Sequence, residues 1–187
     1  MELLVVMGIF SIVVTLSSGI FLQSNRAQRR VLTATAAQAD LRFVLEAIVR
    51  EVRSGAIDYA YYASSGGVSV PTDRLILKTA GGQREEFFLE RTAGVCPTGV
   101  SQCIAMRLDG GASQSLTSLG INVDRLTFYV TPQVDPFTVD PASGLYASSK
   151  QPTVTMAVRV TTVGSQARQD PVTYTAQTTV ASRVYVR

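Results

Sequence analysis

The feature that most constrains the fold of this chain is an apolar run at its start, MELLVVMGIFSIVVTLSSGIFL. From Leu3 to Leu22 the run contains no charged residue and no proline. A helix of this length spans about 30 Å, which is the thickness of the hydrocarbon core of a bilayer. A helix in a globular core does not need an apolar residue on every face. The run therefore predicts a transmembrane helix over residues 1–22 and a single-pass membrane protein.

The helical pattern continues over residues 23–55, which contain no proline. One row of apolar side chains recurs there at helical spacing: Leu41, Val44, Leu45, Ile48 and Val52. Ser54 and Gly55 are typical of a helix end. We expect one helix of about 75 Å over residues 3–54. Its second half is an amphipathic continuation that lays a single apolar row on the rest of the protein.

Residues 56–187 predict an antiparallel β head. Segments 73–78 and 84–91 flank Gly81 and Gly82 and predict a hairpin. Further strands are expected at residues 104–108, 121–131, 153–162 and 173–186. In 153–162, apolar Val154, Met156, Val158 and Val160 alternate with other residues, which is typical of a strand buried on one face. We expect residues 62–73 to be a flexible linker or loop and 133–151 to be a long surface loop. The predicted fold class is α+β, with a long N-terminal α-helix packed on an antiparallel sheet.

The composition argues against catalysis and nucleic-acid binding. The chain has no histidine, so the usual general base and the usual zinc ligands are missing. No phosphate-binding or metalloprotease motif is present. Residues 23–53 carry six arginines against three acids, whereas residues 54–187 carry eleven basic and ten acidic residues. We therefore expect no enzyme, no cofactor and no nucleic acid bound by the nearly neutral head.

Cys96 and Cys103 flank the short segment PTGVSQ. Two cysteines at this spacing without histidine make a poor metal site. A disulfide closing the loop is the favoured interpretation, and free thiols in a reducing cell are the alternative. The disulfide would contribute about 2.5 kcal/mol and indicates an oxidising compartment outside the cytoplasm.

Two acids of the 133–151 loop, Asp135 and Asp140, are weak calcium candidates, because carboxylate and carbonyl oxygens bind this ion. Their spacing differs from that of an EF-hand loop. An ordinary proline-rich turn is the favoured interpretation, and we expect no metal.

An acid, Glu2, stands at the head of the apolar run, where an unpaired charge is costly. The segment MELLVVMGIFSIV resembles the N-terminal segment of type IV pilins and type II secretion pseudopilins. Glu2 occupies the place of the acid in those proteins, and Leu3, Leu4, Val5 and Val6 match the residues that follow it. The resemblance covers about the first 25 residues. Beyond them only the architecture agrees, a long helix followed by an antiparallel sheet.

The resemblance implies a structural subunit of a type IV pilus-like filament that assembles through its N-terminal helix, with a minor pilin as one option. Glu2 of one subunit would lie near the amino terminus of a neighbour, so that the two charges neutralise each other. Gly8 and Gly19 would let the helix loosen in the filament, or would simply allow close helix packing. The implied partners are copies of this chain or other pilin subunits, together with a prepilin peptidase if a leader lies upstream.

Two features depart from the family pattern. The basic leader and the first mature residues are missing before Met1, and we expect them upstream of the assigned start or removed by trimming, unless the chain is not processed. Arg26, Arg29 and Arg30 follow the apolar run, and the positive-inside rule alone would place the head in the cytoplasm. The resemblance and the cysteine pair favour a head outside the cytoplasmic membrane, and an extracellular or periplasmic filament after assembly.

The alternative functions are an envelope-anchored binding or adhesion protein and a pilus component for DNA uptake or protein secretion. The sequence leaves open which machine the chain serves, and whether it is a major or a minor subunit.

Overall fold

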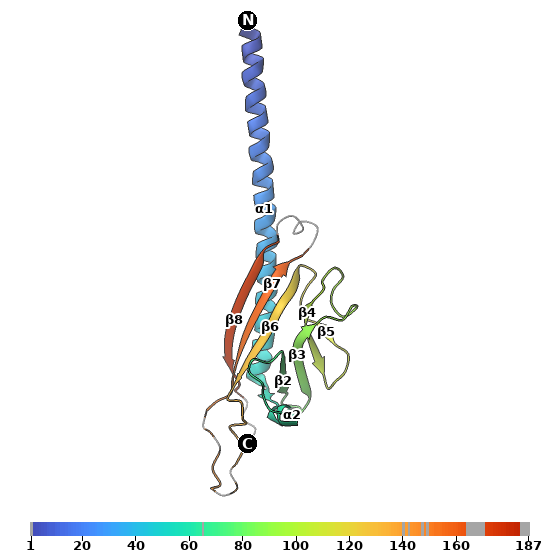
Figure 1. Ribbon diagram of the computed structural model, residues 1–187, viewed down its shortest axis with the longest axis vertical. Coiled ribbons are helices and arrows are strands. Elements are labelled where there is room, and N and C mark those ends of the chain that lie inside the picture. The colour runs from blue at the N-terminus through green and yellow to red at the C-terminus, as the bar shows by residue number, and fades with distance from the viewer. Residues whose placement is uncertain are drawn as a thin grey trace.

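The structure is a computed structural model that describes residues 2–64, 66–139, 141, 143–146, 148, 150–163 and 171–183. Its first element is a continuous helix, α1, over Glu2–Ser54. One half of α1 protrudes from the head and the other half runs behind a three-stranded sheet (Figure 1). The predicted α+β class, with a long apolar N-terminal helix and antiparallel strands, is confirmed.

The second half of α1 packs on the head through the row that its spacing predicts. Its buried residues are Ala37, Leu41, Val44, Ile48 and Val52. The helix ends against β2, where the Gly55 amide donates a hydrogen bond to the Glu51 carbonyl at 2.8 Å. A Cβ atom on Gly55 would lie 3.0 Å from the Glu51 oxygen and 3.2 Å from the Lys78 oxygen. A side chain at this position would crowd both carbonyl oxygens, so glycine favours this close approach of helix and strand.

The first sheet has five antiparallel strands in the order β1-β2-β3-β4-β5. The strands are β1 (Ala56–Ile57), β2 (Arg74–Lys78), β3 (Arg84–Glu90), β4 (Cys103–Leu108) and β5 (Gln114–Ser115). The predicted hairpin is confirmed, because β2 and β3 pair with Lys78 opposite Arg84. A short helix, α2 (Tyr59–Ser64), lies between β1 and β2 in the chain.

The second sheet is an antiparallel meander of β6 (Ile121–Thr131), β7 (Thr153–Thr162) and β8 (Thr173–Ala181). The alternation predicted for β7 is confirmed, since Val154, Met156, Val158 and Val160 are all buried. The alternation of β6 is mixed because the register shifts between Val123 and Arg125. The last strand ends at Ala181, before the predicted end, and residues 184–187 lie outside the described part of the chain.

The head contains two sheets instead of the single sheet that the sequence predicts. Thr72 and Phe128 join them, because each amide donates to the carbonyl of the other residue at 2.9 and 2.8 Å. The predicted loop over residues 62–73 thus begins with the last residues of α2, and its residues 66–71 are turns and irregular chain that lead to this bridge. Tyr62 is buried there, and its hydroxyl donates to the Arg74 carbonyl while accepting from the Ile76 amide. Burial raises the pKa of Tyr62 to about 12.

Candidate functional site

The candidate site is the protruding half of α1. Every residue of this helix from Glu2 to Leu32 is exposed. Between Leu3 and Leu22 the large apolar side chains are 45–79% exposed. Keeping fourteen such side chains in water costs on the order of 20 kcal/mol. A bilayer or another protein chain must cover this segment.

Glu2 lies in the first turn of α1, where a carboxylate complements the positive end of the helix dipole. The four residues that follow it, Leu3, Leu4, Val5 and Val6, are also exposed at the free end of the helix. In the part of the chain that the structure describes, α1 is the one helix that is long and apolar enough to cross a membrane. That property is compatible with a single-pass anchor, and a signal sequence shares it.

Three hydroxyl side chains of the apolar run make their hydrogen bonds inside the helix. The hydroxyls of Ser11, Thr15 and Ser18 donate to the carbonyls four residues earlier at 2.8–2.9 Å. Each hydroxyl can therefore enter an apolar environment without losing a hydrogen-bond partner. This property was not predicted from the sequence, although the serine and threonine positions are its visible signal.

Gly8 and Gly19 lie within the continuous helix, and a Cβ atom at either position would meet no neighbouring atom within 4 Å. Nothing inside the subunit requires glycine there. Their predicted role in helix flexibility or close helix packing stays a prediction about contacts with other chains.

A second row of apolar side chains runs along α1 on another face. Its members recur every eleven residues and are each 68–70% exposed: Phe10, Phe21, Leu32 and Phe43. Eleven residues make three helical turns with a drift of about 20°, so these side chains form one gently turning row. Phe43 lies about 140° around the helix from the buried Ile48. This outward row faces away from the head and extends beyond the predicted membrane span.

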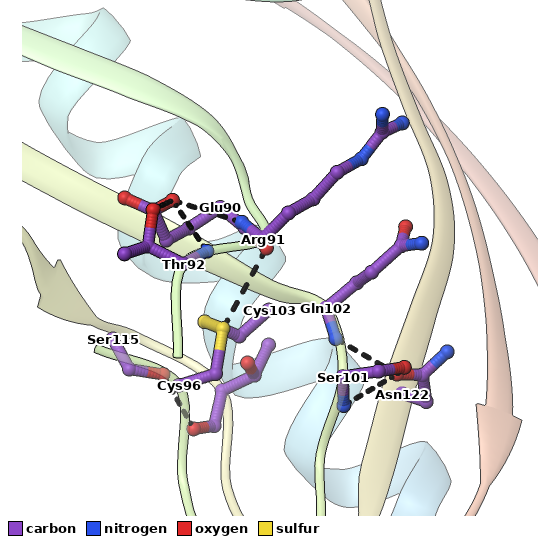
Figure 2. The surroundings of a disulfide bond; sticks show 10 residues. Glu90, Arg91, Thr92, Cys96, Ser101, Gln102, Cys103, Ser115 and Asn122 are labelled. Atoms are coloured by element: carbon purple, nitrogen blue, oxygen red, sulfur yellow. Dashed lines mark hydrogen bonds between the residues drawn. A yellow bond between two sulfur atoms is a disulfide. The ribbon is translucent and has the colours of Figure 1, made fainter. Parts of the chain in front are cut away.

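The disulfide between Cys96 and Cys103 is formed, as the sequence predicts, with a Cα–Cα distance of 5.6 Å. The Oδ1 atom of Asn122 on β6 accepts hydrogen bonds from the Ser101 amide at 3.2 Å, the Ser101 hydroxyl at 2.7 Å and the Gln102 amide at 2.9 Å (Figure 2). The loop is therefore fixed to β4 by the disulfide and to β6 by Asn122. The role of Asn122 was missed because no local pattern in the sequence marks it.

Of the two calcium candidates, the structure describes Asp135 alone. The Oδ1 atom of Asp135 accepts a hydrogen bond from the Phe137 amide at 2.9 Å and so closes a turn. Asp140 lies outside the described residues. Within the described ranges, no group of three or more His, Cys, Asp or Glu side chains is arranged to hold a metal ion.

Comparison of the chain with protein-family models, with curated proteins and with solved structures found no match.

Proposed function

We propose that this chain is a structural subunit, of the pilin or pseudopilin type, of an extracytoplasmic filament that assembles through α1. One observation carries the proposal: a single continuous helix is divided into an exposed apolar half and a half that completes the core of the head. The second half of α1 buries its apolar row against the head without any contribution from the first half of the helix. That first half is consequently available for contacts with other molecules.

The position of Glu2 favours a filament over a simple membrane anchor. An anchor helix gains nothing from a carboxylate beside hydrocarbon, where an unpaired charge is expensive. A charged partner on a neighbouring subunit would offset this cost only in the assembled state. The resemblance of residues 1–13 to prepilin-type helices supports the same function.

The proposed location is the cytoplasmic membrane before assembly, with the head outside the cytoplasm, and a filament afterwards. The Cys96–Cys103 disulfide supports an oxidising compartment for the head, since such bonds are rare in reducing cytosol. The partners are other copies of the chain or related pilin subunits.

The decisive experiment compares Glu2→Gln with the control Glu46→Gln in the cell that makes the protein. Glu46 is an exposed acid on the same helix, away from the apolar run. The chain is quantified by immunoblot in sheared surface filaments and in the membrane fraction. We expect E2Q to reduce the filament fraction at least tenfold, because removing one member of a buried charge pair costs about 3–5 kcal/mol. E46Q should assemble like the wild type.

Two results would contradict the proposal in different ways. Normal filaments from E2Q would show that the Glu2 carboxylate has no role in assembly. A wild-type chain found only as a membrane-anchored monomer would favour the alternative, an envelope-anchored binding protein.

A further inference from the structure

A cleft of about 490 Å³ opens on the head, far in the sequence from the apolar run, between the first sheet and β6. Its wall is rich in arginine side chains, contributed by Arg74, Arg91, Arg107 and Arg125. Three acids also line it: Asp73, Glu90 and Asp124. The function proposed above uses none of these residues.

Arg74 and Arg107 form the centre of the cluster. Their guanidinium carbons lie 5.2 and 4.9 Å from the centre of the Phe88 ring, so the buried ring supports both cations. Both arginines approach the same carboxylate oxygen, Oε2 of Glu86, at 3.8 and 3.9 Å. These distances are too long for hydrogen bonds, and this buried oxygen has no hydrogen-bond partner. Two guanidinium groups thus share one negative charge without being saturated by it.

The hydrogen-bonding capacity of two of the lining acids is already engaged by neighbouring groups. The Oε1 atom of Glu90 accepts from the amides of Arg91 and Thr92 and from the Thr92 hydroxyl at 2.7–2.9 Å. These bonds, that from the Thr92 hydroxyl most of all, hold the pKa of Glu90 below its usual range. Figure 2 shows the Arg91 guanidinium directed away from this carboxylate.

Asp124 is engaged in the same way, because its two oxygens accept from the Asn122 amide group at 3.1 Å and the Thr161 hydroxyl at 2.6 Å. Asp73 is exposed to solvent.

The N–H donors of the arginines are used less fully than the oxygen acceptors of these acids. Each guanidinium has five N–H groups, and Arg107 gives two of its nitrogens to one acceptor, the Ser113 hydroxyl, at 3.4 and 3.1 Å. The cleft therefore offers donors in excess of acceptors.

We propose that this cleft binds a small ligand through an oxyanion, a carboxylate or a phosphate group, with Arg74 and Arg107 as the principal donors. Guanidinium groups bind such planar or tetrahedral oxyanions through paired, charge-assisted hydrogen bonds. Phe88 holds the two guanidinium groups in place before the ligand arrives. Glu86 acts as an internal competitor, because its carboxylate occupies part of the positive field without hydrogen-bonding to either arginine.

The proposal gives effects of opposite sign for neighbouring residues. Arg74→Gln or Arg107→Gln should weaken binding about tenfold each, since each removes charge-assisted donors. Glu86→Gln should strengthen binding several-fold, because the competing negative charge disappears while both arginines remain. Arg159→Gln removes an exposed arginine on β7 outside the cleft and should leave the affinity unchanged.

The test is isothermal titration calorimetry on the full chain in neutral detergent at pH 7 and low salt. The probes are inorganic phosphate and, separately, glucuronate as a carboxylate. Saturable binding of either probe with the four expected effects supports the proposal, and the tighter probe identifies the oxyanion. Absence of saturable binding of both probes overturns it, as does an equal loss in R159Q or weaker binding in E86Q. The affinity of E86Q relative to the wild type tests the proposal even where an arginine variant fails to fold.

Discussion

Replacing Ile48 by alanine tests whether the second half of α1 belongs to the core of the head. Ile48 is 0% exposed and lies in the middle of the buried row of the helix. The change removes three carbon groups, which contribute about 2.4 kcal/mol of transfer free energy. The cavity left between helix and sheet adds to this, so we expect the free energy of unfolding to fall by about 3–4 kcal/mol. The assay is urea unfolding of the full chain in neutral detergent, followed by tyrosine fluorescence, since the chain has seven tyrosines and no tryptophan.

The matched control is Phe43→Ala on the same helix. It removes a larger apolar side chain, but Phe43 is 69% exposed on the face that points away from the head. We expect the free energy of unfolding to change by less than about 0.5 kcal/mol. A loss of less than 1 kcal/mol in I48A, well below the usual range for this substitution, would show that Ile48 does not contribute to the core. An F43A loss as large as that of I48A would show the same lack of distinction between the two faces of α1.

Three further predictions follow from the same structure. The double variant Cys96→Ala/Cys103→Ala should lower the free energy of unfolding by about 2.5 kcal/mol in urea titrations, and reduction of the wild-type disulfide should reproduce this loss. Because the pKa of Glu90 is depressed in the folded state, chiefly by the Thr92 hydroxyl, Glu90 stabilises the fold above its unfolded pKa of about 4.3. The stability of the wild type over Glu90→Gln should therefore be greatest at pH 7 and should fade as the pH falls below about 4. Phe43→Ser should reduce the yield of sheared filaments while circular dichroism shows that the head stays folded. An unchanged yield of filaments would show that the outward row of α1 has no role in assembly.

Sequence periodicity predicted the elements whose burial is one-sided. The row from Leu41 to Val52 repeats with the period of a helix, and its members were found buried except Leu45, which is half-buried against the core. The alternating apolar residues of β7 were found buried on one face. In both elements each buried residue is specified by its position along one segment. The division into two sheets could not be predicted in this way. It depends on pairs such as Thr72 with Phe128, which are distant in the sequence.

The functional features likewise divide into those that the sequence predicts and those that only the fold reveals. The exposed apolar run and Glu2 were visible in the sequence, because composition alone decides that such a segment needs an apolar partner. The outward row ending at Phe43 could be counted in the sequence but not interpreted, since its meaning depends on which face of α1 the head covers. The cleft was invisible for a stronger reason. Arg74 and Arg107 come from different strands, and only the register of β2, β3 and β4 places both beside Phe88.

On the proposed function, the apolar run of α1 cannot by itself drive filament assembly. A bilayer already covers its side chains as well as neighbouring helices would, so leaving the membrane gains little hydrophobic free energy. The driving force must come from interactions that lipid does not provide. Glu2 supplies one, because its charge lacks a partner beside hydrocarbon and would acquire one in a filament. The outward row supplies the other, since Leu32 and Phe43 lie beyond the span of a bilayer and are exposed to water until another subunit covers them. The acid and the outer end of this row therefore matter more for assembly than their share of the helix surface would indicate.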